Sequence, residues 1–401
     1  MPSRPRAGTK PETKSTKSKP ARKSPAPRNL VIMLDGTGNE LGRNLSNVLK
    51  LYRIAQKNEQ QLVYYSPGVG TISRISPWQR FRQKLVGVLG LAFGFGLDEN
   101  VLGAYRFLVE NYQNGDRIYL FGFSRGAWTA RVLAGFIHLI GLLEPEQINM
   151  SDSALGTYKK AANDNQLDLA WHFARVIGAR RVPIEFIGVW DTVASVLVPR
   201  PDRFWIPSLE TLPYTLQNPS VARFRHALAI DERRRMFRVA KWNDPQKFEP
   251  NPFNKSMTKN QDIKQVWFAG VHSDVGGGYP EKESALSKYP LVWMAEEAKK
   301  AGLKISTQML NHLAYGKPRK GSKHQYEPPS PTGMLHRSLT TGWWALEIIP
   351  KNKKYREWKR WSLFWHYFPW AEPRRIGEAE IHPSVDERKN ALPDYRPVNA
   401  P

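Results

Sequence analysis

The chain has 401 residues and a formal net charge of +24, with 60 Lys and Arg against 36 Asp and Glu. This length suits one large α/β domain with insertions or two smaller domains. The absence of cysteine excludes disulfides, thiolate catalysis and Cys-ligated zinc. The longest apolar stretch, residues 85–97, is too short to cross a bilayer as a helix, and no secretory signal is visible. We therefore expect a cytoplasmic bacterial protein, with export by a specialised secretion system as an option.

Residues 1–28 form a basic segment that is rich in proline and serine. The segment carries nine Lys or Arg and one acid, Glu12. Such a composition buries too little apolar surface to offset the entropy of ordering, so we expect a disordered tail. The tail either is simply solvated or contacts nucleic acid or anionic lipid. We expect residues 29–400 to form a single domain.

The first half of the chain alternates strand and helix. The predicted elements are a strand at 30–34, a helix at 44–56, a strand at 61–65, a helix with Asp98 as its N-cap, a strand at 118–121 and a helix at 127–140 that Gly141 ends. This alternation predicts an α/β fold of the α/β-hydrolase type, with a mostly parallel sheet that helices cover on both faces.

The second half is less regular. The predicted elements are polar helices within 144–179, a buried strand at 182–190, an irregular segment at 199–219, strands at 236–242 and 264–271, a helix at 290–301 and a basic loop at 316–331. We expect 144–179, 199–219 and 316–331 to be insertions, which lie above the edge where the parallel strands end. No internal repeat is present.

The strongest local signal is IYLFGFSRGA at residues 118–127. An apolar strand stops at Gly122, and a helical pattern begins at once after Gly126, with Ser124 between the two glycines. Strand, sharp turn and helix are the context that a nucleophile elbow requires. Side chains at Gly122 and Gly126 would collide with the neighbouring strand and helix, because the turn is so tight. The pattern predicts Ser124 as a nucleophile.

Two further groups stand at the ends of predicted strands, Asp191 and His272. Sites in open α/β sheets form at this edge, and Ser, Asp, His is the chain order that α/β-hydrolases use. A serine hydroxyl is a weak nucleophile, so an imidazole must take its proton and later return it to the leaving group. A carboxylate then holds the imidazole in the correct tautomer. We therefore predict a triad of Ser124, Asp191 and His272.

Each of these residues has a competing interpretation. Asp191 could be a turn residue, and His272 could be a structural histidine bonded to the glycine-rich segment that follows it. The competing residues for the two roles are the acids Asp231 and Asp274 and the histidines His226 and His382.

The oxyanion of a tetrahedral intermediate needs backbone donors. We expect the N–H of Arg125, at the start of the helix, and a second donor from Gly36 or Thr37, after the first strand. The segment DGTGN at 35–39 could instead cradle a phosphate, but it lacks the lysine and the spacing of nucleotide-binding loops. A metal site around Asp35, His272 and Asp274 is a weak alternative, since the spacing matches no known ligand pattern. No metal or cofactor is expected.

Six segments together extend these motifs over about residues 30–300. They are DGTGN at Asp35, YYSPGVGT at Tyr64, residues 96–131 including GFSRGA, GVWDTVAS at Gly188, HALAIDERR at His226 and FAGVHSDVGGGY at Phe268. With them the sequence resembles a large family of uncharacterised α/β-hydrolase-like proteins of bacteria and fungi. The catalytic domain of that family also occurs in phospholipase effectors of the type VI secretion system.

The resemblance implies an esterase or phospholipase, with Ser124, Asp191 and His272 at the family's catalytic motifs. The substrate would be a phospholipid or a related lipid ester. Two alternatives stay open: a carboxylesterase for small esters, and a non-catalytic module that binds a polyanion or a partner protein on a hydrolase scaffold.

A lipid substrate requires a surface that meets a membrane. Residues 341–370 are rich in tryptophan with interleaved Lys and Arg, which suits peripheral contact with an anionic headgroup region. These tryptophans could equally cover the sheet. Residues 85–97 are a second candidate, as a lid or acyl-chain groove, and their alternative is a buried glycine-rich turn.

Overall fold

The structure of the protein is a computed structural model. It describes residues 26–36, 44–68, 96–163, 167–193, 197–199, 207–209, 212–251, 254–340, 343–344, 347, 351–352, 358, 366–368, 370–377 and 379–399. Four of the sequence-based predictions lie wholly or mostly outside these residues. They concern the tail at 1–25, Thr37, the apolar segment 85–95 and most of 341–370.

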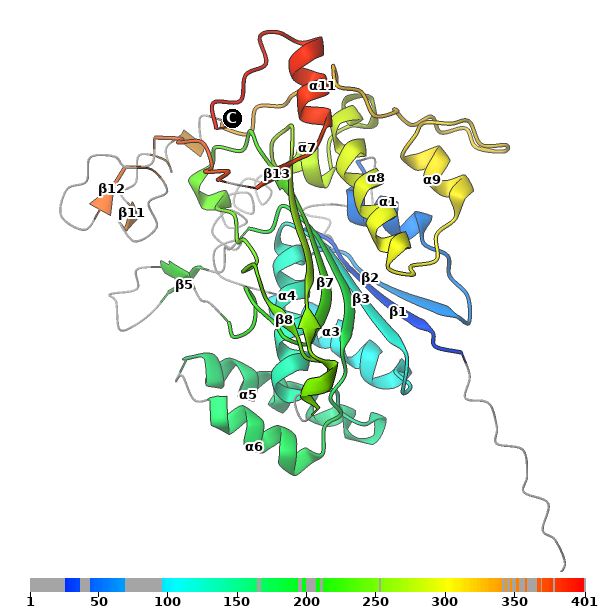
Figure 1. Ribbon diagram of the computed structural model, residues 1–401, viewed down its shortest axis with the longest axis vertical. Helices are drawn as coiled ribbons and strands as arrows, with labels where there is room; N and C mark the ends of the chain where they lie inside the picture. Colours follow the sequence, from blue (N-terminus) through cyan, green and yellow to red (C-terminus); the bar gives the residue numbers. More distant parts are fainter. Residues whose placement is uncertain are drawn as a thin grey trace, which may run out of the picture.

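A seven-stranded sheet with the order β13-β10-β7-β4-β3-β1-β2 forms the centre of the molecule (Figure 1). All six strand pairings in it are parallel. The strands are β1 (Asn29–Leu34), β2 (Gln61–Ser66), β3 (Arg117–Phe123), β4 (Ile184–Trp190), β7 (Val221–Ala229), β10 (Asp262–Phe268) and β13 (Glu380–Ile381). The prediction of an α/β fold with a mostly parallel sheet is confirmed.

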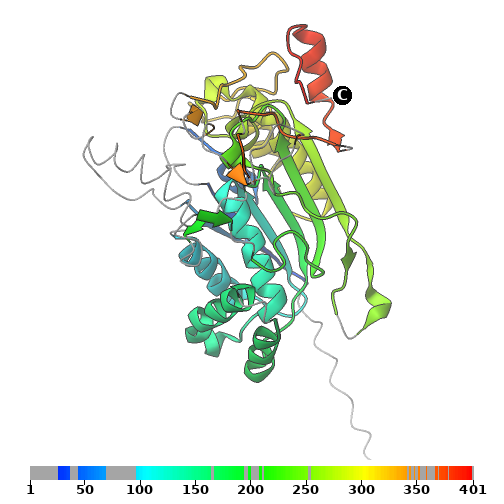
Figure 2. The same ribbon diagram turned by 90° about the vertical axis from the view of Figure 1, so that its left-hand side faces the viewer.

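Helices cover both faces of the sheet, which explains why its central strands read as continuous apolar runs. Successive residues of β1 point to opposite faces. Leu30 and Ile32 pack in one core, with α3 (Leu97–Asn111) and α4 (Arg125–Ile140). Val31 and Met33 pack in the other core. The helices on that face are α1 (Asn47–Ile54), α8 (Ala285–Lys300) and α9 (Thr307–Leu313). Figure 2 shows α4, in cyan, running along one side of the strands.

The segment 144–179 is helical, but it lies at the opposite end of the sheet from the expected position. It forms a 3₁₀ turn and the helices α5 (Ser151–Asn163) and α6 (Leu167–Ile177). Tyr158 of α5 packs on Phe136, with 5.7 Å between ring centroids, and α6 also contacts α4. In Figure 1 both helices lie at the far end of α4 from α7 (His272–Gly276). The physical reason is that α4 is apolar all round, so its outer face also needs a cover.

One central strand was missed and one predicted strand does not exist. Residues 236–242 contain only the end of a 3₁₀ turn and a single bridge, between Val239 and Val193. The strand in this part of the sheet is β7, whose sequence VARFRHALA does not read as apolar. Its charges are neutralised inside the fold. Arg225 is buried and donates from Nε to Glu297 Oε2 at 2.6 Å and from Nη2 to Asp262 Oδ2 at 2.8 Å.

Three predicted boundaries shift. The N-cap of α3 is Gly96, at a φ of +80°, so Asp98 lies in the first turn instead of capping the helix. There its negative charge still interacts favourably with the positive end of the α3 dipole. Helix α8 begins at Ala285 and contains Pro290 internally. The folded domain also includes residue 28, because Arg28 donates to Asp116 from its backbone N–H at 3.0 Å and from Nη2 at 2.7 Å. None of the helices in the described part of the chain is long and apolar enough to span a membrane.

Candidate active site

Ser124 occupies a strained turn between β3 and α4. It is the N-cap of α4, with φ of +57° and ψ of −118°, a backbone conformation that residues other than glycine rarely adopt. The Ser124 N–H donates to the carbonyl of Trp190, the last residue of β4, at 3.1 Å. The turn is therefore held against the neighbouring strand, as in a nucleophile elbow.

The two glycines around Ser124 allow the turn to be this tight. A Cβ atom on Gly122 would lie 2.4 Å from the carbonyl oxygen of Gly126. A Cβ atom on Gly126 would lie 2.1 Å from the carbonyl oxygen of Leu34 and 2.7 Å from that of Asp35. The close approach of Gly126 brings the first turn of α4 against the end of β1, where Gly36 begins the next loop.

Asp191 and His272 form a hydrogen-bonded pair. Asp191 directly follows β4 at a φ of +35°, and His272 begins α7 (His272–Gly276) just after β10. His272 Nδ1–H donates to Asp191 Oδ2 at 2.5 Å. Asp191 is fully buried, and 4% of His272 is exposed. Because β4, β7 and β10 are adjacent in the sheet, their ends bring two residues 81 positions apart into contact.

The His272 ring also lies next to the serine turn. It is 4.7 Å from the ring centroid of Phe123, the residue before Ser124, and 4.8 Å from that of Phe237 on another side. Ser124 Oγ makes no hydrogen bond to His272 in the described part of the chain. Contacts between nucleophile and base are often open in unliganded enzymes and tighten when substrate binds. The structure thus brings together Asp191 and His272 directly, and His272 and the serine turn through Phe123.

Arg374 is a further residue at this site, which the sequence analysis missed. Its guanidinium donates from Nη1 to Asp191 Oδ1 at 2.6 Å and from Nη2 to Asp191 Oδ2 at 3.0 Å. The same group also donates to the carbonyls of Ala229, at 2.9 Å, and Phe237, at 2.5 Å. No local motif marks an arginine 183 residues from its partner as part of the site.

These contacts decide the charge state of the pair. Burial by itself would raise the pKa of Asp191. The Arg374 guanidinium and the hydrogen bond from His272 outweigh burial and hold that pKa well below its ordinary value. Burial lowers the pKa of His272, against the opposing effect of Asp191, and Arg234 lowers it further. The pair therefore rests at neutral pH as a carboxylate and a neutral imidazole, the state in which a histidine can accept a proton.

Glu232 is a second carboxylate that holds His272, and it too was missed. It accepts the backbone N–H of His272 at 3.2 Å, the Ser338 hydroxyl at 2.9 Å and the Arg234 guanidinium at 2.8 Å. Burial opposes ionisation of Glu232. The hydrogen bond and the charge of Arg234 nevertheless lower its pKa to about 2. Glu232 thereby fixes the backbone at the start of α7.

The competing acids have other partners. Asp231 Oδ2 accepts the Gly270 N–H at 2.7 Å and the Tyr395 hydroxyl at 2.8 Å. Asp274 Oδ1 pairs with His336 Nδ1 at 2.6 Å. Both carboxylates brace the loops around His272 without bonding its ring.

The competing histidines lie in structural positions. His226 is fully buried in β7, and its Nε2 accepts the backbone N–H of Thr192 at 3.1 Å. His382 follows β13, and its Nδ1 pairs with Ser384 Oγ at 2.9 Å. Among the described residues, no group of three or more His, Asp or Glu is arranged to hold a metal ion.

Two of the expected oxyanion donors, the backbone N–H groups of Arg125 and Gly36, differ in their hydrogen bonding. Arg125 is the first residue of α4, so its N–H belongs to the group that lacks partners within the helix. The Gly36 N–H donates to Asp35 Oδ1 at 2.7 Å. Asp35 in turn accepts the hydroxyls of Ser46 at 2.5 Å and Tyr65 at 2.9 Å. Gly36 can therefore bind an oxyanion only after its N–H leaves Asp35, and no sequence pattern indicates this bond.

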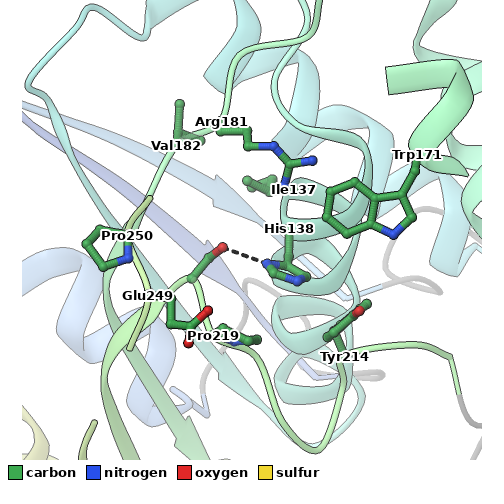
Figure 3. Close-up of a pocket in the computed structure, with 10 residues that line it drawn as sticks. Ile137, His138, Trp171, Arg181, Val182, Tyr214, Pro219, Glu249 and Pro250 are labelled. Carbon is green, nitrogen blue, oxygen red and sulfur yellow. Dashed lines mark hydrogen bonds between the residues drawn. The ribbon is translucent and has the colours of Figure 1, made fainter. Parts of the chain in front are cut away.

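A cavity of about 200 Å³ lies at the other end of α4 (Figure 3). His138, near the end of α4, points into it between Tyr214 and Trp171, and its Nδ1 pairs with Ser220 Oγ at 2.7 Å. The Arg181 guanidinium lies over the Trp171 ring at 4.1 Å from its centroid. This cavity is separated from Ser124 by the length of α4 and does not contribute to the site above.

His138 is expected to make stability depend on pH. Burial, with the Arg181 charge as a smaller cause, lowers the His138 pKa from 6.5 to about 4. Between these values the unfolded chain binds a proton that the folded protein does not, so the free energy of unfolding falls as the pH falls. At about 1.4 kcal/mol per pKa unit, the loss from pH 7 to pH 4 is up to roughly 3 kcal/mol.

The measurement is urea unfolding at pH 7 and pH 4.5 for the wild type, His138→Gln and the control His172→Gln, which changes an exposed side chain on α6. His138→Gln should flatten the dependence on pH, and His172→Gln should leave it in place. An equal slope in all three proteins would show that His138 does not cause it.

The sheet, the strained serine turn and the buried Asp–His pair define an α/β-hydrolase-like protein. Residues 28–297 match the family described as "T6SS, Phospholipase effector Tle1-like, catalytic domain". The chain belongs to this family. Arg374 and Ser338 lie beyond the matched residues, although both reach the site.

Individual relatives cover the chain in part. An uncharacterised protein of Saccharomyces cerevisiae is 35% identical over 234 residues, which are 55% of this chain and 33% of that protein. The chain thus spans about a third of the length of this relative.

Two solved structures also resemble the chain, each at 19% identity. One is an uncharacterised protein from Pseudomonas aeruginosa, with a TM-score of 0.35 over 70% of this chain and 46% of that one. The other is the Tle1 effector bound to the VgrG spike from the type 6 secretion system, with a TM-score of 0.36 over 68% of this chain and 57% of that one.

Proposed function

We propose that the protein is a serine hydrolase that cleaves carboxylic esters, above all acyl esters of phospholipids or related lipids, through an acyl-enzyme on Ser124. The observation that carries the proposal is the buried hydrogen bond of 2.5 Å between His272 and Asp191, whose histidine ring lies against the residue before Ser124. Family membership supports the lipid substrate, because the family is described by phospholipase effectors.

In the proposed mechanism, Ser124 Oγ attacks the ester carbonyl while His272 Nε2 takes the hydroxyl proton. Asp191 holds Nδ1–H of His272 and stabilises the imidazolium that forms. The Arg125 N–H and a donor from residues 36–37 bind the oxyanion. The imidazolium then protonates the leaving alkoxide. In the second half, His272 activates a water that attacks the acyl-enzyme, and Ser124 recovers its proton.

The proposal extends to the setting of the reaction. Residues 29–400 would act as one catalytic domain, and peripheral contact with an anionic membrane would deliver the lipid. The basic tail and residues 341–370 are the proposed contacts, with nucleic acid as the lesser option for the tail. Export by a type VI secretion system is part of the same proposal, on the strength of the family alone.

The test is covalent labelling followed by substrate comparison. The purified protein is treated with a fluorophosphonate probe, the mass shift is read on the intact chain, and the modified peptide is mapped. We expect one label, on Ser124. Phosphatidylcholine vesicles and p-nitrophenyl butyrate are then offered side by side, and faster release of fatty acid from the vesicles supports the lipid hydrolase over a small-ester carboxylesterase. Absence of any label, while a known serine hydrolase reacts in the same tube, would favour the non-catalytic binding module.

We expect kcat/KM to decrease with falling pH only below the ordinary histidine pKa of 6.5. His272 must be neutral to accept the serine proton, and burial lowers its pKa from the ordinary 6.5. The acid limb of kcat/KM therefore has its midpoint below pH 6.5, and activity persists at pH values where an exposed histidine would be largely charged. A pH–rate profile on a soluble ester measures the midpoint; one at or above pH 6.5 would contradict the assignment of His272 as the base.

A further inference from the structure

An open cavity of about 450 Å³ adjoins the acid of the candidate triad. Its walls come from three parts of the chain: residues 238–241, Trp267 in β10, and residues 374–377. Four of the lining side chains are cations, and none of the described lining residues is Asp or Glu. The four are Arg238, Lys241, Arg374 and Arg375.

Two of these cations, Lys241 and Arg374, are held in the cavity wall by contacts that fix their positions. Lys241 Nζ donates to the carbonyl of Ile376 at 2.9 Å and lies 5.5 Å from the centroid of the Trp267 ring. Arg374 is buried and is held by Asp191 and two backbone carbonyls. Asp191 offsets the charge of Arg374, so the positive field in this concave surface comes from Arg238, Lys241 and Arg375. The cavity therefore attracts an anion.

Trp267 is the aromatic residue of the described lining. Its side chain is fully buried, and its indole N–H has no hydrogen-bond acceptor among the described residues. The described lining of the cavity thus combines cationic groups with the Trp267 side chain.

The lining fits a phosphate group better than a carboxylate. A phosphate offers three or four acceptor oxygens and up to two charges, which matches several cations converging from different segments. The volume also exceeds what a bare phosphate ion needs, since a single water occupies about 30 Å³ of liquid. We propose that this cavity binds a phosphate group, either on the headgroup of a lipid or as free phosphate.

The position of the cavity gives the site a link to the candidate triad. Arg374 lines the cavity and also donates to both carboxylate oxygens of Asp191. A bound phosphate therefore lies one side chain away from the carboxylate that holds His272. The binding site itself stands whether or not the proposed esterase activity does, because its argument uses only the cavity lining.

The test measures binding on the full chain carrying Ser124→Ala, so that no ester is consumed. Titration calorimetry at constant ionic strength uses inorganic phosphate and glycerol 3-phosphate as probes. Co-sedimentation uses phosphatidylcholine vesicles with and without phosphatidic acid. The site variant is Lys241→Gln with Arg375→Gln, and the control, Lys317→Gln with Lys320→Gln, removes the same charge from the exposed loop 316–331. Thermal unfolding establishes that each variant folds.

We expect saturable binding that the site variant weakens by about tenfold or more and the control changes by less than about twofold. Tighter binding of glycerol 3-phosphate and selective recovery on phosphatidic acid vesicles assign the lipid headgroup. Binding of inorganic phosphate alone assigns free phosphate. The proposal is overturned if no probe binds saturably, or if site and control variants weaken binding equally, which would reflect overall charge. Either result leaves the labelling of Ser124 to decide the proposed function separately.

Discussion

Ser124→Ala is expected to lower kcat/KM for ester hydrolysis by about 10⁴- to 10⁶-fold. In the proposed mechanism the variant removes the atom that forms the acyl-enzyme, and residues that act as a unit in a triad lose nearly all of their combined effect when the nucleophile is lost. The remaining rate enhancement would come from substrate binding and the oxyanion donors. The fold should be unaffected, because the Ser124 contact to Trp190 uses the backbone N–H and not the hydroxyl.

The measurement compares initial rates on phospholipid vesicles and on a short-chain ester for the wild type, Ser124→Ala and Ser153→Ala. Ser153 is an exposed residue of α5, at the far end of α4, and provides the matched control. Ser153→Ala should retain the wild-type rate. If purified Ser124→Ala hydrolyses the ester at the wild-type rate, Ser124 is not the nucleophile and the proposed mechanism is wrong.

Gly126→Ala should destabilise the protein by at least about 3 kcal/mol. The new Cβ would lie 2.1 Å from the carbonyl oxygen of Leu34, and both groups belong to backbones that cannot rotate away. Either β1 or the start of α4 must move, and forcing extra atoms into a packed interior costs about 1–3 kcal/mol or more. Because Ser124 is the cap of the same helix, catalysis should fall together with stability.

Gly156→Ala is the control for this prediction. Gly156 lies inside α5, and an added Cβ meets nothing within 4 Å. Alanine is better than glycine in a helix interior by about 1 kcal/mol, so this variant should be neutral or slightly stabilised. The measurement is denaturant unfolding of both variants. If Gly126→Ala has the same denaturant midpoint as the wild type, then α4 does not approach β1 as closely as described.

The central strands and the serine turn were predictable because local rules determine them. β1, β3 and β4 are buried on both faces and read as apolar runs, and the tight turn at Ser124 needs small residues on either side. The edge where Asp191 and His272 lie follows from parallel pairing, since all strands end on the same side. The sequence does not determine which acid bonds His272, and only the three-dimensional structure distinguishes Asp191 from Asp231 and Asp274.

Most of the missed features depend on contacts that are remote in sequence. β7 was overlooked because Arg225 breaks its apolar pattern, and the acids that neutralise Arg225 lie in β10 and α8. Arg374 and Glu232 carry no local signal, because their roles arise only when distant loops meet around His272. Gly36 was expected to be available as a donor, whereas the carboxylate of the preceding residue takes its N–H. Sequence patterns report the face that a residue occupies but not the partner that it meets there.

The contact between Arg374 and Asp191 also sets the order in which the site can be completed during synthesis. The two residues are 183 positions apart. At about 5–20 residues per second, the ribosome adds Arg374 roughly 10–40 s after Asp191. Until then the nascent chain holds the carboxylate without the guanidinium that neutralises it. Each new copy of the protein therefore passes through most of its translation with an incomplete candidate site.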